Sequence, residues 1–313
     1  MPLVHMQKDY CMITDTLSDE VFEKGNYDIM VMNRFLSNVD INTIIELKKR
    51  FGFKLIVDND DYWKLDPSHI LAQRYHDYGI TDYILKYIEI ADLCTTTHER
   101  LAEEISQYNK NVQILPNALP YGKEQFLDNK VDSDLVRFFW SGSGTHIHDL
   151  DILKNPMKRC VGLPIHTIMA GYNEGEKILW DRMIGSFTCG LKLNPKIFNY
   201  NEVTKYMAAY ADSDVSVIPL VDNKFNSMKS NLKVLETAAK KNPAIVSHVN
   251  PYLGLPVHYV KNQSDWFRHI RDLTYDHDMR IDSGLNLFEY CQRNFNFDKI
   301  NSERFSIYNK LIS

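Results

Sequence analysis

The residues best suited to chemistry lie in the segment FNSMKSNLKVLETAAKKNPAIVS. It follows the apolar run DVSVIPL, and its pattern predicts a polar loop and then a helix over residues 230–241. On a helix with about 3.6 residues per turn, Lys229, Lys233 and Glu236 share one stripe. A helix N-terminus with two lysines suits a diphosphate, and Glu236 could accept hydrogen bonds from ribose hydroxyls. The alternative is a solvated face on which Glu236 pairs with Lys233 and Lys240.

A second polar group follows the apolar run FKLIV and comprises Asp58, Asn59, Asp60 and Asp61. Proteins built on parallel sheets place ligands and catalytic groups at the carboxyl ends of strands. A carboxylate at such a position could take a proton from a hydroxyl group. The Asp-x-Asp spacing also suits a divalent cation, and the simplest alternative is a solvated acidic turn that caps the next helix.

A third group is the loop SGSGTHIHD, which follows the apolar run VRFFW. The small residues Ser141, Gly142 and Ser143 would let backbone N–H groups approach a phosphate, although such residues are also common in plain turns. We expect His146 to contact the same ligand. No H-x-x-x-H spacing in the sequence supports a metal site.

Elements that could position these groups are visible as two series of short, β-rich apolar runs separated by helix-like segments. Alternating β and α units of this length predict parallel sheets with helices on both faces. The first series lies at residues 27–33, 53–58, 92–96 and 112–116, and the second at 136–140, 165–170, 214–220 and 244–248.

The restart of the pattern predicts two doubly wound, Rossmann-like α/β domains, 1–135 and 136–294, with a ligand cleft between them. A length of 313 residues fits two domains. The formal charge of −5, from 36 basic and 41 acidic residues, gives no global basic field for a nucleic acid.

The sequence also contains features that bear on the cellular location of the protein. Its apolar runs are much shorter than the roughly 18 to 20 residues of a membrane span, and the N-terminus lacks the apolar core of a signal peptide. The five cysteines, Cys11 among them, are scattered without a C-x-x-C pair, so we expect free thiols. These features predict a cytoplasmic protein.

Several segments, taken in order, resemble the nucleotide-sugar-binding core of GT-B glycosyltransferases, especially the group that includes sucrose and phosphatidylinositol mannosyl transferases. In that group an acidic residue just before a run of small residues contacts the nucleotide ribose, and Glu236 before Thr237-Ala238-Ala239 matches it. The resemblance extends over about residues 53–252. Its segments are ADLCTTTHERLAEEI, NVQILPNALP, FFWSGSGTHIHDL and DVSVIPL with VLETAAKKNPAIVS after its loop.

The resemblance implies that the second domain holds the donor and the first the acceptor, with residues 295–313 packing back on the first domain. It implies catalytic roles for Asp58 and Asp60 on the acceptor or the reacting sugar, and for Lys229 and Lys233 on the leaving diphosphate. The expected donor-binding residues are Ser141, Gly142, Ser143, His146, Pro219, Asn226, Ser230, Asn231 and Glu236, and the expected acceptor-side residues are Arg34 and Asp61.

The sequence departs from the family at two places. The family's first glutamate, eight positions before the second, is replaced by Met228, so we expect altered sugar recognition. The Arg and Lys phosphate clamp after the first strand of the second domain is also missing. No cofactor is expected to be required, and a divalent metal, although possible, is not expected because the lysine-bearing helix makes it dispensable.

The predicted function is transfer of a hexose or pentose from a nucleoside diphosphate sugar, such as a UDP-sugar, to a hydroxyl of a glycan or small molecule. The resemblance leans towards retention at the anomeric carbon. One alternative acceptor is the hydroxymethylated bases of phage DNA, which the run Lys48-Lys49-Arg50 could serve and the net acidity disfavours. A different class is a non-catalytic nucleotide-sugar- or glycan-binding protein. A nicotinamide-dependent oxidoreductase is disfavoured because no G-x-G-x-x-G follows a strand.

Overall fold

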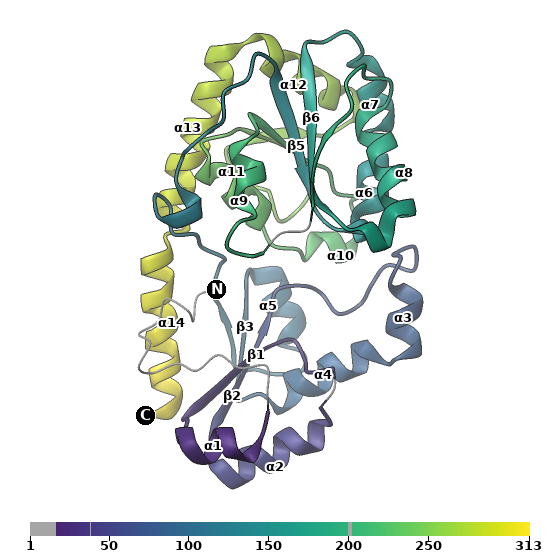
Figure 1. Ribbon diagram of the computed structural model, residues 1–313. Coiled ribbons are helices and arrows are strands. Elements are labelled where there is room, and N and C mark those ends of the chain that lie inside the picture. Colours follow the sequence, from purple (N-terminus) through teal and green to yellow (C-terminus); the bar gives the residue numbers. More distant parts are fainter. Residues whose placement is uncertain (1–16, 38, 200–201) are drawn as a thin grey trace. The chain divides into compact units, whose positions relative to one another are not determined.

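The computed structural model describes residues 17–37, 39–199 and 202–313, and Cys11 lies outside them. The chain forms two compact units (Figure 1). Each unit has its own parallel sheet, which confirms the predicted α/β class. The first unit consists of Met1–Asn117, Met228–Ser230 and Phe297–Ser313, and the second of Ala118–Ser227 and Asn231–Asn296.

The first unit is built on four parallel strands in the order β1-β2-β3-β4. The strand register aligns Asn33 with Asp58 and Asp58 with Thr95, so polar side chains from three strands meet at the carboxyl edge. The strands are β1 (Ile29–Asn33), β2 (Lys54–Asn59), β3 (Leu93–Thr96) and β4 (Val112–Ile114), and the helices are α1 (Asp19–Gly25), α2 (Ile41–Phe51), α3 (Ala72–Asp77), α4 (Ile80–Ile90), α5 (Glu99–Ile105) and α14 (Phe297–Ile312).

The C-terminal helix α14 covers one face of this sheet (Figure 1). Tyr308 of α14 is buried against Ile56 of β2 and Leu93 of β3. Because β-branched and leucine side chains on this face would otherwise meet water, the sheet depends on the last helix of the chain for its cover.

The second unit is built on six parallel strands in the order β10-β9-β8-β5-β6-β7. The four strands that the apolar runs predict are present, and they form the centre of the sheet. The two outermost strands were not predicted, because both are short and carry few fully buried side chains. The strands are β5 (Val136–Ser141), β6 (Ile165–Tyr172), β7 (Lys196–Asn199), β8 (Val215–Ile218), β9 (Ala244–Ser247) and β10 (His258–Val260).

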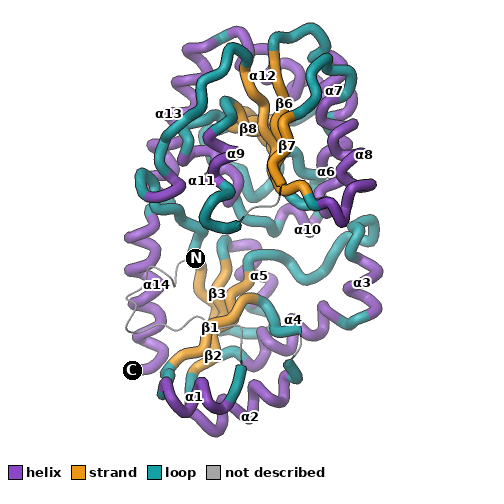
Figure 2. Tube along the Cα trace, viewed as in Figure 1, coloured by secondary structure: helices purple, strands orange, loops and turns teal. Residues whose placement is uncertain are grey.

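Helices cover both faces of the six-stranded sheet (Figure 2). One core contains Tyr210, Leu235 and Leu287, from α9 (Met207–Ala211), α11 (Leu232–Ala239) and α13 (His277–Asn294). The other contains residues of α6 (Ile147–Asp151), α7 (Lys154–Arg159), α8 (Lys177–Thr188) and α12 (Gln263–Tyr275). A further short helix is α10 (Lys224–Ser227), and single 3-10 turns occupy η2 (Glu124–Phe126), η3 (Gly144–His146) and η4 (Glu174–Glu176).

Two sequence-level properties can be read directly from the described residues. Cys94, Cys160, Cys189 and Cys291 are free thiols. Within ranges 17–37, 39–199 and 202–313, no helix combines the length and apolar character needed to cross a bilayer.

The segment from Ala118 to the start of β5 belongs to the second unit, whereas the sequence pattern set the domain boundary near residue 135. Lys240 holds part of this segment in place. Its side chain is only 1 % exposed, and its Nζ donates to Gln125 O at 2.9 Å, Leu127 O at 2.6 Å and Asn129 Oδ1 at 2.7 Å. A single buried ammonium therefore satisfies three acceptors of a segment that has no strand of its own.

Replacing Lys240 with methionine should destabilise the second unit. K240M keeps the volume but leaves the three acceptors without a donor, which we expect to cost about 1–3 kcal/mol of unfolding free energy in urea denaturation. The matched control is K241M, since Lys241 pairs with Asp128 at the surface and such pairs contribute about 1 kcal/mol or less. Equal losses in the two variants would contradict the role given to Lys240.

A half-buried histidine pair joins β10 to α12 and α13. His258 Nε2 lies 3.0 Å from Ser283 Oγ, and the rings of His258 and His269 are 5.2 Å apart. Burial lowers the pKa of His258 from 6.5 to about 4, and the neighbouring His269 adds to the shift while Asp272 opposes it. The folded state therefore holds this imidazole neutral.

This shift predicts a pH dependence of stability. Between pH 6.5 and about 4 the unfolded chain takes up a proton at His258 that the folded chain does not, so the unfolding free energy should fall as the pH falls. Denaturation curves recorded across this window should show a smaller slope with pH in H258Q, in which the titrating group is absent. A slope identical to that of the wild type would contradict the assignment.

Candidate functional site

Polar side chains of the second unit gather where β5 and β8 end. Ser141, the last residue of β5, donates a hydrogen bond to Tyr210 Oη at 2.9 Å, and Tyr210 in turn donates to Glu236 Oε2 at 2.6 Å. Two predicted donor-site residues, Ser141 and Glu236, are thus brought together through a tyrosine. Tyr210 is not among the residues that the sequence predicts for the site.

Glu236 is buried, with 7 % of its surface exposed. Burial raises its pKa, while hydrogen bonds from Tyr210 and Tyr206 and the charge of Lys233 act in the opposite direction. The alternative of a solvated face is therefore wrong for Glu236. Lys240, proposed as its ion-pair partner in that alternative, is directed instead to the 125–129 segment.

The helix that carries Glu236 is shorter than the sequence predicts. It begins at Leu232 with Asn231 as its N-cap and ends at Ala239, whereas the predicted span is 230–241. Lys229 therefore lies outside the helix and does not share a stripe with Lys233 and Glu236. The reason is tertiary, because the residues Met228–Ser230 pack with the first unit.

Lys233 and His146 form the centre of a hydrogen-bonded chain. Lys233 Nζ lies 3.4 Å from His146 Nε2 and 5.5 Å from the ring centroid of Trp140. His146 Nδ1 lies 2.7 Å from Asp149 Oδ2. The cation is therefore held between an imidazole nitrogen and an aromatic face, both of which favour a positive charge.

Asp149 is the functional candidate that the sequence did not indicate. It is 6 % exposed, and its Oδ1 accepts hydrogen bonds from Val221 N at 2.8 Å and Asn226 Nδ2 at 3.0 Å. Burial alone would raise its pKa, but hydrogen bonds from His146 and Val221 and the charge of Lys233 act in the opposite direction, and the pKa is lowered. The only sequence signal was its i,i+3 spacing from His146.

The small-residue loop after β5 is tightly packed. Gly142 N donates to Ala170 O at 3.0 Å, and Gly144 N donates to Glu176 Oε2 at 3.2 Å. Ser143 Oγ lies 2.7 Å from Thr145 Oγ1. The expectation that these small residues present free amides is therefore wrong for Gly142 and Gly144, whose N–H groups already have partners within the second unit.

The other predicted donor-site residues have mixed surroundings. Asn226 is buried, and its amide hydrogens are directed to Asp149 Oδ1 and to Val221 O at 2.9 Å, so it supports Asp149. Pro219 follows β8 and is buried. Ser230 is half-buried in the Met228–Ser230 segment, and Asn231 is half-buried at the start of α11.

The acidic group of the first unit lies at the carboxyl end of β2, as predicted. Asp58 Oδ1 accepts a hydrogen bond from Thr95 Oγ1 at 2.5 Å, and burial raises its pKa, with Asp60 adding to the shift and Arg304 of α14 opposing it. Asp60 Oδ1 lies 3.4 Å from Asn33 Nδ2. Burial also raises the pKa of Asp60, and the charge of Asp61 adds to this effect.

Arg34 and Lys229 complete this group within the first unit. Arg34 follows β1 in a left-handed conformation, with φ of 53°, and its Nη2 donates to Tyr75 Oη at 3.1 Å. Lys229 Nζ lies 3.9 Å from Asp61 Oδ1. Carboxyl groups whose pKa is raised by burial are candidates for proton transfer. Among the residues that the structure describes, no three His, Cys, Asp or Glu side chains converge as metal ligands.

Comparison with known proteins identifies the fold. No family model and no curated protein matches the sequence. Among solved structures, sucrose-phosphate synthase from Thermosynechococcus elongatus matches 93 % of this chain and 75 % of its own, with a TM-score of 0.70 and 16 % identity. Anabaena Alr3699/HepE in complex with UDP and glucose matches 93 % of this chain and 80 % of its own (TM-score 0.67, 12 % identity).

A glycosyltransferase from Rickettsia africae is similar to the same extent, matching 94 % of this chain and 79 % of its own with a TM-score of 0.65 and 12 % identity. At these identities the similarity establishes the fold. The chain has the fold of the GT-B glycosyltransferases, as the sequence resemblance implied.

The close packing of the loop after β5 can be tested at a glycine. A Cβ on Gly171, at φ of 103°, would lie 2.2 Å from Gly142 O, whereas one on Gly162, at φ of 96°, would have nothing within 4 Å. Both alanine variants carry backbone strain, so their difference isolates the clash. We expect G171A to lower the unfolding free energy by about 1–3 kcal/mol more than G162A in chemical denaturation. Equal losses of unfolding free energy in the two variants would contradict the close packing, because they would mean that the loop after β5 shifts without cost.

Proposed function

We propose that this chain is a glycosyltransferase that moves a sugar from a UDP-sugar to a hydroxyl group. Similar structures supply one support, since the HepE structures contain UDP, UDP-glucose or UDP with glucose. The observation that carries the proposal is the pairing, on α11, of a positioned lysine with a buried glutamate next to the carboxyl ends of β5 and β8. A lysine ammonium can donate hydrogen bonds to a diphosphate, and a carboxylate can accept them from ribose hydroxyls.

Lys233 is the residue that we assign to the diphosphate. The leaving UDP gains negative charge as the glycosidic bond breaks, and a cation already held in place stabilises that charge without having to be reorganised. Glu236 is assigned to the ribose hydroxyls, because its carboxyl group is kept in place by Tyr210. We propose that Lys229 assists at the diphosphate and that transfer needs no metal ion or other cofactor.

The first unit is assigned to the acceptor. Asp60 and Asp58 have a raised pKa, and a carboxylate of that kind is a competent base for a hydroxyl group or a counter-charge for a cationic sugar. Arg34 and Asp61 are assigned to acceptor binding beside them. Met228 replaces a family glutamate and is buried, so recognition of the sugar falls to other groups. Following the family resemblance, we propose retention at the anomeric carbon, which NMR of the product will test.

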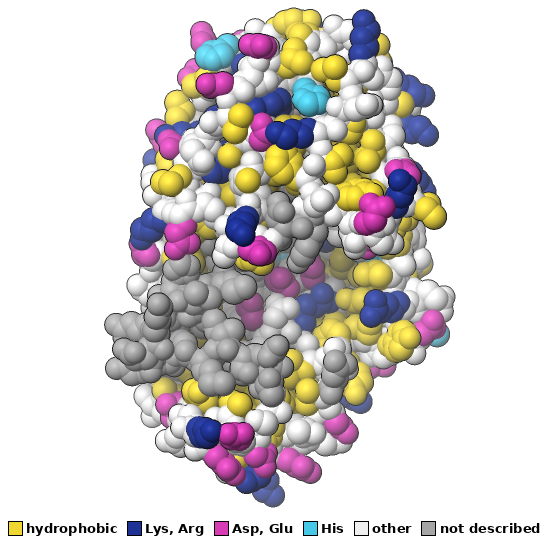
Figure 3. All heavy atoms as spheres, in the orientation of Figure 1, with side chains coloured by type: hydrophobic (Ala, Val, Ile, Leu, Met, Phe, Trp, Pro, Cys, Tyr) yellow, Lys and Arg dark blue, Asp and Glu magenta, His cyan; other side chains and the backbone are white. Residues whose placement is uncertain are grey.

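Transfer to phage DNA is the minority proposal for the acceptor. Its basic run is less available than the sequence indicates, because Lys48 pairs with Asp92 at 2.7 Å and Arg50 pairs with Glu23 at 2.9 Å and also with Asp19. On the described surface in Figure 3, Lys and Arg side chains are scattered among Asp and Glu. A glycan or small-molecule hydroxyl is therefore favoured. The free thiols fit the cytoplasmic location that we propose.

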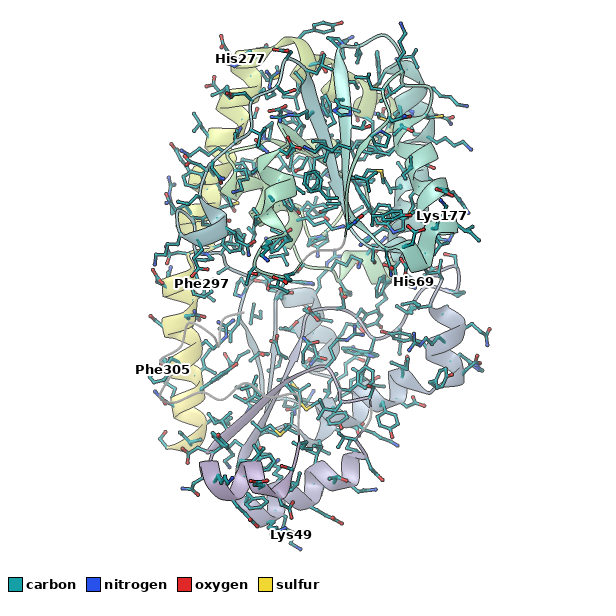
Figure 4. All side chains as sticks on the ribbon, in the orientation of Figure 1. Lys49, His69, Lys177, His277, Phe297 and Phe305 are labelled. Atoms are coloured by element: carbon teal, nitrogen blue, oxygen red, sulfur yellow. The ribbon has the colours of Figure 1, made fainter. Side chains whose placement is uncertain are left out.

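The proposal predicts that the protein binds UDP and hydrolyses or transfers sugar from a UDP-sugar. Calorimetry should detect UDP binding in the wild type, and K233M should weaken it about tenfold or more, the effect of losing one hydrogen bond to a charged group. The control is K177M, because Lys177 is exposed at the start of α8 on the outside of the second unit (Figure 4).

Each outcome of this experiment has a distinct meaning. Failure of the wild type to bind UDP in the presence or absence of magnesium would contradict the proposed donor. Tight binding of a UDP-sugar without turnover on any hydroxyl acceptor would favour a non-catalytic binding protein. Turnover on hydroxymethylated DNA that falls steeply with added salt would favour the DNA acceptor.

A further inference from the structure

We propose that Asp149 is a positioning residue that fixes the tautomer of His146, so that His146 accepts a hydrogen bond from Lys233 and holds its ammonium for the donor diphosphate. The inference rests on the proposed function, because it assigns Lys233 to the diphosphate. It adds a residue, Asp149, and a mechanism that neither the family resemblance nor the site prediction contains.

The ammonium group of Lys233 limits the hydrogen bonds that it can form. A lysine ammonium has three hydrogen-bond donors and no acceptor. The contact between Lys233 Nζ and His146 Nε2, at 3.4 Å, is therefore a hydrogen bond only if Nε2 carries a lone pair. With a proton on Nε2, two donors would face each other and the contact would be repulsive.

The other imidazole nitrogen must then carry the proton, and Asp149 supplies the reason. His146 Nδ1 lies 2.7 Å from Asp149 Oδ2, so an Nδ1–H group donates directly to the carboxylate. A carboxylate only accepts, and it therefore favours the tautomer with the proton on Nδ1. The negative charge of Asp149 therefore favours the tautomer in which Nε2 has a lone pair, and this lone pair can accept a hydrogen bond from Lys233.

The orientation of the Asp149 carboxylate is itself fixed by hydrogen bonds. Its Oδ1 accepts from Val221 N at 2.8 Å and from Asn226 Nδ2 at 3.0 Å, and it is 6 % exposed. The amide of Val221 comes from the loop after β8, and Asn226 belongs to α10. One carboxylate oxygen is thus anchored by two donors while the other is left for His146.

The face of Trp140 restrains Lys233 from another direction. Its ring centroid lies 5.5 Å from Lys233 Nζ, within the range of cation–π attraction. Trp140 belongs to β5, and its ring also contacts that of His146 at 6.1 Å between centroids. The lysine side chain is therefore held by an indole face and an imidazole lone pair.

This arrangement makes the isosteric change of Asp149 to asparagine informative. In D149N the donors Val221 N and Asn226 Nδ2 would keep the amide oxygen at the Oδ1 position, so the new NH2 group would face His146 Nδ1. The imidazole could accept a hydrogen bond from this NH2 group at Nδ1 only if its proton moved to Nε2. The Nε2–H group would then face the Lys233 ammonium, and two donors would repel each other. The substitution alters almost no volume but inverts the hydrogen-bond polarity of the chain.

The test combines NMR of histidine nitrogens with UDP binding. In the wild type, long-range proton–nitrogen spectra should show His146 as the neutral Nδ1–H tautomer near neutral pH. A wild-type His146 that is protonated on Nε2, either neutral or charged, would overturn the proposal even if no variant folds. In D149N, the His146 signals should change to those of the Nε2–H tautomer.

Calorimetry measures the consequence for UDP. D149N should weaken UDP binding about tenfold, the effect expected when one charge-assisted hydrogen bond is lost. D151N is the matched control, since Asp151 also lies in α6 but pairs with Arg182 and Ser186, and it should change UDP binding less than about twofold.

A double-mutant cycle separates positioning from general damage. If Asp149 acts through Lys233, D149N/K233M should bind UDP no more weakly than K233M alone. Additive losses would overturn the proposal, because they mean that Asp149 acts independently of the lysine. If the wild type shows the Nδ1–H tautomer but does not bind UDP, the proposed function fails while the pairing of Asp149 with His146 stands.

Discussion

A carboxylate taken out of water is stable only when donors surround it, and at Asp149 this requirement brings three segments together. The donors come from the loop after β5, the loop after β8 and helix α10. The contact with Asp149 fixes His146, which in turn lies beside Lys233 of α11. The same helix places Glu236 against Tyr210, whose hydroxyl group also contacts Ser141. The candidate donor site thus contains two hydrogen-bonded chains that meet on α11, and in each of them a charged group is oriented by a neighbour, as electrostatic catalysis requires.

The sequence was sufficient for the fold but only partly so for the site. Buried parallel strands are continuous apolar runs, so β5, β6, β8 and β9 could be recognised from composition alone. The start of α11 could not, because Met228 is buried with the first unit and that contact is invisible to helix periodicity. Glu236 and Tyr210 lie far apart in sequence, so their pairing depends on the sheet that brings them together. Asp149 escaped prediction because one aspartate among 41 acidic residues has no distinguishing local pattern.

The charge distribution explains how a chain with a formal charge of −5 could bind a diphosphate. Many of its cations are engaged by acids, including Lys48 with Asp92 and Lys241 with Asp128. Lys233 differs, because an indole face and an imidazole hold it as well as the more distant carboxylates. A single cation held in this way would suit a small dianion, whereas a long polyanion needs a broad basic surface.

The position of α14 has a consequence for biosynthesis. The ribosome completes all four strands of the first sheet by Ile114. The contact of Ile56 and Leu93 with Tyr308 can form only after α14 has been translated. Everything between Ala118 and Asn296 emerges in the interval, and most of it belongs to the second unit. Until the last helix arrives, the nascent chain exposes an apolar sheet face of the kind that chaperones bind.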